Sequence, residues 1–553
     1  MNLRYFKNLL PMTAVVLTMA MSSCTKDLDV TPIDPNLTLE TDEASAFVKC
    51  YANLGMESYN GANGDCDISG YDGGTTGFIR QIFNSNELTT DEAICGWGDE
   101  GISDFVNNTY TSAHPMLEGL YYRLFYGVTM CNDYLYKFEG QDATRTAEVR
   151  FLRALYYYEL MDLYANVPLV TQSPQGGAIS EQKTRAEIFS FVESELLAVA
   201  GEGTDNTAVL SEPKVKYADG TTGANVTDGY GRADKAAAWM LLARLYLNAE
   251  VYTGTAQWAK AASYAEKVIK SPYHLWKGNT ATATSYRMLF MGDNGSSGAS
   301  CEAILPILQD GATTSGWAGA LFLIASTTKD DMGNFGTGEY WGGNRARPQF
   351  VAKFFPKAAN TPMGTEWKDM PGEASDDRAL LHSADRTLEI PTKIDVADFA
   401  KGFSVAKWTN IYSDGGNSHD SKFIDTDVFF LRVAEAYLTY AEATARQNGN
   451  KTTAQGSDYV NELRERAHAT TKDAYTLDEL LDEWSREFYY EGRRRVDLVR
   501  FDQFGGPQAT YKWAWKGGDA NGTVFPKTRN VFAIPATEIN ASKGAINQND
   551  GYK

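Results

Sequence analysis

The chain has 553 residues, of which 43% are hydrophobic and 22% are charged, a composition typical of folded globular proteins. Its formal net charge of −20 argues against binding to nucleic acid or to an anionic membrane surface, because both attract basic proteins. The length allows a large buried core and more than one lobe.

The N-terminus has the layout of a secretory signal peptide. Residues 1–23 begin with basic residues, continue as an apolar run to Met21 and end in small residues, and they are too short for a convincing membrane span. The sequence "MSSC" at 21–24 resembles a bacterial lipobox, which predicts that Cys24 is acylated and becomes the first residue of the mature protein. A plain signal peptide that happens to contain a cysteine is the alternative.

Residues 24–42 are polar and contain proline, so they are predicted to be a tether that leads to the folded body. The acidic "TKDLD" directly after Cys24 resembles the surface-export signal of Bacteroidetes-type lipoproteins. Together these features predict a lipid-anchored protein at the cell surface of a Gram-negative bacterium.

The other cysteines are odd in number and scattered, so they form no disulfide framework, and none has zinc-ligand spacing. We therefore expect no cofactor. The sequence evidence for a structural calcium site is weak. "DCDISG" (65–70) begins like a calcium loop, but Thr76 stands where the bidentate glutamate belongs. "GDNG" (292–295) and "DTD" (425–427) could supply oxygen ligands, although Asp-x-Asp at 425 is more typical of a helix cap.

Apolar residues recur with helical periodicity along much of the chain. The helix of 147–170 is expected to end near Asn166, because Pro168 cannot continue it. The pattern predicts helices over 43–60, 115–140, 147–170, 185–200, 232–254, 258–275, 425–447 and 457–468, and a further helix and a turn over 477–501.

The pair 232–254 and 258–275 resembles a degenerate tetratricopeptide repeat. Trp239, Leu242 and Tyr246 occupy the expected slots of the first helix, but the turn between the helices is too long. The pair 425–447 and 457–468 follows the same plan. Residues 276–424 are irregular and rich in Gly, Asn, Asp, Thr and Trp, and a long insert of this kind in a helical scaffold is usually functional.

These patterns predict a helical solenoid that carries a loop-rich lobe. The predicted regions of the mature body are 43–275, 276–424 and 425–553, with the loop-rich lobe in the middle.

Three tryptophans on predicted loops have small neighbours that leave their ring faces open. They are Trp97 in "CGWGDEG", Trp317 in "TTSGWAGA" and Trp341 in "GTGEYWGGN". Sugar rings present polarised C–H groups that favour the electron-rich face of an aromatic ring. Each tryptophan could instead plug the core beneath its loop, but three in one setting favour a platform for carbohydrate.

Paired acids raise the alternative of a glycoside hydrolase, which needs two carboxylates across a cleft. The candidates are Asp91/Glu92, Asp99/Glu100 and Asp376/Asp377. Adjacent side chains diverge in both strands and helices, so none of these pairs is itself a catalytic dyad, and we predict no enzyme activity. The basic turn "EGRRRVD" (491–497) is predicted to form internal salt bridges.

Motifs along nearly the whole mature chain resemble the SusD/RagB family of glycan-binding outer-membrane lipoproteins, with the starch-binding founding member the most similar. The stretches that carry the resemblance are "NELTTDE" (86–92), "AEVRFLRALYYY" (147–158), "GRADKAAAWMLLARLYLNA" (231–249), "DDRALL" (376–381), "RVAEAYLTYAEA" (432–443), "EFYYEGRRRVDLVRF" (487–501) and "NQNDGYK" (547–553).

The resemblance implies a mostly α fold, a tetratricopeptide-like right-handed superhelix with a large loop-rich insert. It also implies a protein without catalytic activity, which captures oligosaccharide at the outer membrane and delivers it to a TonB-dependent, SusC-like transporter. A protein–protein adaptor built on the same solenoid is the alternative from another functional class.

The starch-binding member uses three aromatics, an arginine and an amide. By resemblance, Arg80 matches the arginine and would donate to sugar hydroxyls, Trp317 stands in place of a tyrosine, and Trp341 matches a platform tryptophan.

Two further positions depart from the family pattern. The third aromatic aligns with Cys95, and the amide aligns with Glu100. Either Trp97 is structural and Cys95 faces the ligand, or Trp97 takes the platform role. These departures leave starch, dextran and fructan open as ligands.

Overall fold

The computed structural model describes residues 42–172, 180–218, 229–416 and 418–552. The chain divides into two units, Met1–Ala46 and Phe47–Lys553, and the solenoid and the loop-rich region both belong to the second unit. The predicted signal peptide, Cys24 and the tether up to residue 41 lie outside the described residues. No helix in the described part of the chain is long and apolar enough to cross a membrane.

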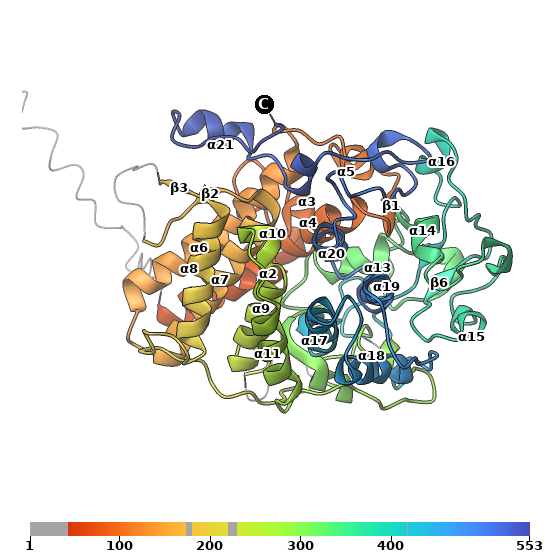
Figure 1. Cartoon of the computed structure of the whole chain (residues 1–553), viewed down its shortest axis with the longest axis horizontal. Coiled ribbons are helices and arrows are strands. Elements are labelled where there is room, and N and C mark those ends of the chain that lie inside the picture. Colours follow the sequence, from red (N-terminus) through yellow and green to blue (C-terminus); the bar gives the residue numbers. More distant parts are fainter. Residues whose placement is uncertain (1–41, 173–179, 219–228, 417, 553) are drawn as a thin grey trace, which may run out of the picture. The chain divides into compact units, whose positions relative to one another are not determined.

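The helices that follow one another in the chain also pack side by side (Figure 1), α6 on α7, α7 on α8, α8 on α9 and α9 on α11. The series then continues with α17, which packs on α11, and with α18, which packs on α17. This arrangement confirms the predicted tetratricopeptide-like solenoid. Its members are α6 (Pro115–Phe138), α7 (Ala143–Tyr164), α8 (Arg185–Val199), α9 (Lys235–Leu247), α11 (Trp258–Ile269), α17 (Ala434–Gln447) and α18 (Ala454–Arg466).

Local sequence signals set the helix boundaries. Thr184 and Glu187 form a capping box at the start of α8, and Asp142 caps α7 by accepting the Arg145 N–H. The long turn after α9 is filled by an extra short helix, α10 (Ala249–Thr253), which explains why the predicted repeat has too many residues between its helices.

One predicted helix is partly wrong. Residues 428–432 form strand β8 (Val428–Arg432), which pairs antiparallel with β4 (Ala303–Ile307), and α17 begins only at Ala434. The run Val-Phe-Phe-Leu favours a strand because branched and aromatic side chains fit a pleated surface. Asp425 therefore caps no helix; it accepts the backbone N–H of Gly311 at 2.7 Å.

Apart from α2 and α19, the remaining helices and strands are short (Figure 1). The strands are β1 (Ala93–Cys95), β2 (Val167–Pro168), β3 (Gln182–Lys183), β5 (Asn344–Ala346), β6 (Leu381–His382) and β7 (Ser404–Val405). The other helices are α2 (Glu43–Gly55), α3 (Gly73–Thr76), α4 (Phe78–Phe83), α5 (Ile102–Asn107), α12 (Ser285–Met288), α13 (Ala320–Ala325), α14 (Pro348–Val351), α15 (Met370–Ala374), α16 (Lys393–Ala397), α19 (Leu477–Phe488), α20 (Arg494–Arg500) and α21 (Ala536–Ala541).

Single-turn 3-10 segments and one π-helical segment complete the described elements. They are η1 (Gly61–Asn63), η2 (Asn84–Leu88, π), η3 (Gly298–Glu302), η4 (Asp330–Met332), η5 (Ala358–Asn360), η6 (Lys516–Gly518) and η7 (Lys527–Asn530).

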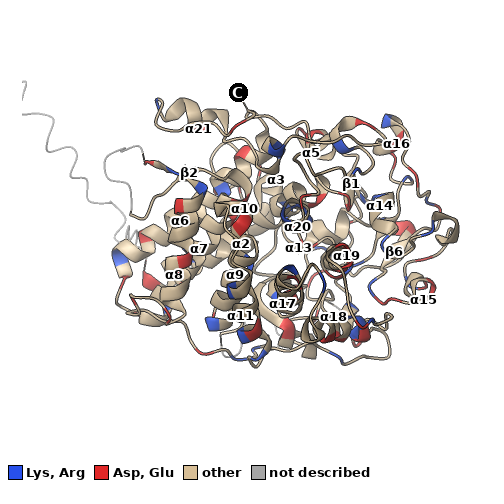
Figure 2. Ribbon diagram, viewed as in Figure 1, with Lys and Arg blue, Asp and Glu red and all other residues tan. Residues whose placement is uncertain are grey.

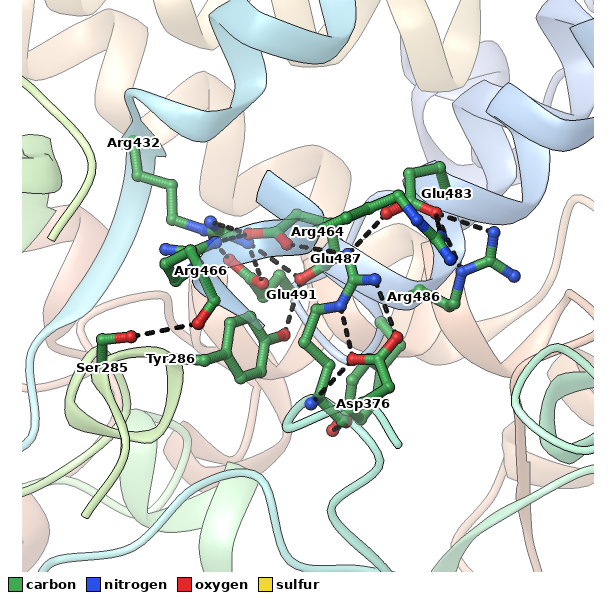
Figure 3. A network of polar contacts seen from close by, with 12 residues as sticks. Ser285, Tyr286, Asp376, Arg432, Arg464, Arg466, Glu483, Arg486, Glu487 and Glu491 are labelled. Atoms are coloured by element: carbon green, nitrogen blue, oxygen red, sulfur yellow. Dashed lines mark hydrogen bonds and ion pairs between the residues drawn. The ribbon is translucent and has the colours of Figure 1, made fainter. Parts of the chain in front are cut away.

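The C-terminal helices are joined to the loop-rich region by a buried network of arginines and glutamates (Figure 3). Glu487 of α19 lies at its centre and contacts Arg378, Arg432 and Arg466, all of them fully buried. Nearby, Arg494 of the basic turn pairs with buried Asp91 at 2.7 Å, which confirms that this turn forms internal salt bridges. Buried charges of this kind are tolerated only when they are paired.

Candidate functional site

A short strand pair brings two of the predicted tryptophans together. Strands β1 and β5 run antiparallel, with Cys95 opposite Asn344. Trp97 follows the end of β1 and Trp341 precedes the start of β5, so the pairing places them at the same end of the ladder. Their ring centroids lie 6.2 Å apart.

Trp341 also contacts the third tryptophan. The rings of Trp317 and Trp341 have centroids 6.2 Å apart and planes inclined by 36°. All three side chains are partly exposed. We call Trp97, Trp341 and Trp317 the tryptophan array; its aromatic surface is continuous because Trp341 touches both of the others.

Each indole in the array is fixed by its own N–H. Trp97 donates to the Gly342 carbonyl at 2.7 Å, Trp317 donates to the Ala62 carbonyl at 3.0 Å, and Trp341 donates to the Glu339 carboxylate at 2.7 Å. These bonds use the ring edges and leave the ring faces free for stacking. A sugar ring contacts the face of an indole.

Buried Glu57 holds the backbone of the Trp317 loop. Its Oε1 accepts the N–H of Trp317 at 2.7 Å and that of Ala318 at 3.3 Å. Burial raises the pKa of Glu57 to about 6, although the two N–H groups act in the opposite direction. The carboxylate is therefore the form that anchors this loop at neutral pH.

Arg80, on α4, lies behind the array. Its guanidinium carbon is 5.5 Å from the centroid of Trp97 and 5.2 Å from that of Phe322, and one nitrogen donates to the Gly74 carbonyl at 2.6 Å. Another nitrogen is 3.5 Å from Asp99. Arg80 is only 7% exposed, so the geometry makes it chiefly a support for Trp97, and its predicted donation to sugar hydroxyls is limited to that exposed edge.

The structure resolves the alternative between Cys95 and Trp97. Cys95 lies inside β1 and is 2% exposed, and burial raises the pKa of its thiol to about 11. The interpretation that places Cys95 against a ligand is therefore wrong, because its side chain is buried. Trp97 is the side chain that this loop contributes to the array.

Glu100 is exposed on the same turn. Its neighbour Asp99 is the acid that contacts Arg80, a role that the sequence did not indicate.

Sequence reasoning also missed two side chains around Trp317. Lys422 lies with its Nζ 5.2 Å from the centroid of Trp317 and 3.2 Å from Glu339, and Phe423 packs edge-on against Trp317 with centroids 5.3 Å apart. Lys422 and Phe423 belong to no recognisable motif and lie about a hundred residues after Trp317 in the chain. Only the tertiary fold could reveal that they are its neighbours.

Two of the acid pairs considered for catalysis lie mainly in the core. Asp91 and Glu92 are 0% and 1% exposed, and Asp91 is held by Arg494 and Lys353. Asp376 is 6% exposed and pairs with Arg378. These carboxylates serve the buried ion pairs. Over the described ranges, no group of three or more His, Cys, Asp or Glu side chains is placed to hold a metal ion.

Comparison with known proteins agrees with these observations. The SusD family model matches residues 387–552. The chain is 38% identical to the starch-binding protein SusD of Bacteroides thetaiotaomicron, over 100% of both chains. A SusD-like protein of Bacteroides ovatus is 35% identical over 14% of each chain.

Solved structures share the fold at lower sequence identity. A laminarin-binding SusD-like protein superposes with a TM-score of 0.61 at 20% identity, covering 93% of this chain and 99% of the other. Surface glycan-binding protein A of Bacteroides thetaiotaomicron, solved with laminarihexaose, gives a TM-score of 0.63 at 18% identity over 92% and 98%. On its full-length identity to SusD, the chain belongs to the SusD family.

Proposed function

We propose that this protein binds a neutral glycan, a glucan of the starch or dextran type, at the tryptophan array. The single observation that carries the proposal is the contact of Trp341 with both Trp97 and Trp317, which makes one partly exposed aromatic surface. Successive sugar rings of an oligosaccharide can stack along such a surface, each covering an indole face.

The names of the relatives support the same ligand class. The full-length relative is described as starch-binding, and two structural neighbours are described as laminarin-binding and glycan-binding. The net charge of −20 disfavours an anionic glycan. Acidic and basic residues alternate along helices such as α11 and α18 (Figure 2).

We further propose that the protein works at the cell surface. In this proposal Cys24 carries the lipid that holds it on the outer membrane, and it passes the bound glycan, uncleaved, to a TonB-dependent SusC-like transporter. The support for this part is membership of the SusD family together with the lipobox-like sequence at 21–24.

The test is affinity electrophoresis of the mature protein in gels that contain starch, dextran, levan or laminarin. We expect retardation by at least one α-glucan, and we expect Trp341→Ala to abolish it. Trp239→Ala is the matched control, because Trp239 is also partly exposed and also donates its indole N–H to a carboxylate, that of Glu202.

Two outcomes would contradict the proposal. Absence of retardation by every glycan, with tight co-purification of a protein partner, would favour the adaptor. New reducing ends released from a retarding glycan by the purified protein would make it a hydrolase.

A further inference from the structure

A pocket in the loop-rich region is separate from the ring faces of the tryptophan array. It has a volume of about 510 Å³, within the range of roughly 300–1,000 Å³ that is usual for small-molecule sites. Its described lining comes from residues 334–338, 410–416 and 418–421. The lining residues that matter most here are Asn334, Gly338, Asn410, His419, Asp420 and Ser421.

The lining restricts what the pocket can bind. The side chains that line it carry amide, hydroxyl, imidazole and carboxylate groups, and Ile411 is the one aliphatic side chain among those described. An apolar ligand would displace water from these polar groups and offer no hydrogen bond in return. No Lys or Arg belongs to the described lining, and Asp420 would repel an anion, so phosphate and acidic sugars are disfavoured. A neutral, hydroxyl-rich molecule remains.

The walls of the pocket are held by hydrogen bonds to neighbouring backbone and side chains. Asn410 accepts the Asp425 N–H at 2.8 Å and donates to the Gly336 carbonyl at 3.0 Å. The His419 ring is anchored through Nδ1, which lies 3.1 Å from Asp425, so Nε2 is on the opposite edge of the ring. Asp420 uses Oδ1 to accept the N–H groups of Lys422 and Phe423. A fixed polar frame binds hydroxyls with less loss of entropy than a mobile one does.

The pocket is connected to the array through two adjacent backbone segments. The Gly338 N–H donates to the Ser421 carbonyl at 2.8 Å, and both residues line the pocket. One residue further along each segment, Glu339 and Lys422 pair at 3.2 Å. Glu339 accepts the Trp341 indole N–H, and the Lys422 ammonium lies 5.2 Å from the Trp317 ring. The Glu339–Lys422 pair thus links the array to the pocket.

We propose that this pocket is a second sugar subsite, which takes one or more neutral sugar units of the same glycan beyond those stacked on the array. The proposal rests on the proposed function, since it needs a glycan on the tryptophans. It predicts that the protein distinguishes long oligosaccharides from short ones, because only a long chain reaches from the array past Glu339 and Lys422 into the pocket.

The test fills the pocket without touching the array. A Cβ on Gly338 would meet only the Ser421 carbonyl oxygen, at 3.6 Å, which is ordinary contact, so Gly338→Leu should fold. Gly338→Ala adds one methyl and gives a graded comparison. The matched control is Gly372→Leu on α15, where a Cβ would meet no atom within 4 Å and which does not line the pocket.

Binding is measured by isothermal titration calorimetry with maltotriose and maltoheptaose, and with the isomalto-oligosaccharides of the same lengths. For the series that binds, we expect Gly338→Leu to weaken heptasaccharide binding about tenfold or more, with Gly338→Ala between it and wild type. We expect trisaccharide binding to remain unchanged, and Gly372→Leu to bind both lengths like wild type.

The outcomes separate the two proposals. Equal heptasaccharide affinity in wild type and Gly338→Leu would overturn the second subsite, and so would an equal loss for both lengths. In either case, loss of all binding in Trp341→Ala would leave the proposed function standing. Undiminished binding of both lengths in Trp341→Ala would overturn the proposed function itself.

Discussion

Trp317 and Trp341 lie with ring centroids 6.2 Å apart and planes inclined by 36°, an orientation in which one curved chain can touch both rings. The two residues belong to different loops, and each ring is held by its own hydrogen bond, to the Ala62 carbonyl and the Glu339 carboxylate. The surface is therefore largely formed before a ligand arrives. A preformed site loses less entropy on binding than one that must be ordered.

The first prediction concerns Trp317. Trp317→Ala should weaken binding of the retarding glycan by about 0.5–1.5 kcal/mol, because it removes one stacking face. Trp317→Tyr should keep most of the affinity, since it keeps an aromatic face. Calorimetry with an oligosaccharide that covers the array is the measurement. If Tyr and Ala weaken binding equally, stacking on this ring is not what holds the ligand.

The parts of this protein that the sequence predicts are those determined by local signals. The periodic helices α6 to α11 follow from their apolar spacing and caps, as with Thr184 and Glu187. The contact of Trp97 with Trp341 does not follow from local signals, because β1 and β5 have three residues each and their pairing depends on tertiary structure. The same holds for Cys95, which that pairing places opposite Asn344 and which the tertiary fold buries.

The second prediction concerns a buried carboxyl pair, Glu87 and Glu92. Glu87 accepts the N–H groups of Gly492 and Arg493 through Oε1, at 2.7 and 3.0 Å. Burial, with Glu92 beside it, raises the pKa of Glu87 well above its usual value. The folded chain therefore keeps a proton that the unfolded chain releases, and this group's contribution to stability falls as pH rises above about 4.5.

Glu87→Gln mimics the protonated acid, so the variant should not lose stability through this group as pH rises. We expect the variant to gain free energy of unfolding over wild type at pH 8 and to match wild type at pH 4, by urea denaturation at both values. Glu373→Gln, exposed on α15, is the control and should change little at either pH. A gain of the same size at both pH values would contradict the explanation that Glu87 stays protonated in the folded chain.

The third prediction concerns Glu487 in the buried network of Figure 3. Burial opposes its charge, but Arg466, Arg432 and Arg378 outweigh burial and lower the pKa of Glu487 to about 2. This stabilisation is fully present above the unfolded pKa of 4.5 and is lost as pH falls toward 2.

Glu487→Gln should therefore destabilise the protein by about 3–5 kcal/mol at pH 7, since it leaves three buried guanidinium groups short of a negative charge. The difference from wild type should shrink as pH falls below 4. Denaturant unfolding across this range is the measurement, with exposed Glu465→Gln as the control. A difference that stays constant with pH would show that the loss is one of packing.

The fourth prediction concerns Lys516, a lysine that is 0% exposed. Its Nζ donates to the Tyr511 carbonyl at 2.8 Å and lies 4.1 Å from the Trp513 ring and 4.8 Å from the Phe525 ring. Burial lowers the pKa of Lys516 from 10.5 to about 7. Between these two values the unfolded chain binds a proton that the folded chain has released, so this group makes the free energy of unfolding rise with pH from about 7 to 10.5.

Lys516→Met removes the titrating amine and keeps an unbranched side chain among the same rings. We expect a flatter rise of unfolding free energy between pH 7 and pH 9 than in wild type, measured by urea denaturation at several pH values. Lys527→Met, exposed at the start of η7, should keep the wild-type slope, because it removes a surface lysine and leaves Lys516 in place. Parallel pH profiles for wild type and Lys516→Met would mean that Lys516 keeps its charge inside the aromatic cage, held by the ring faces and the Tyr511 carbonyl.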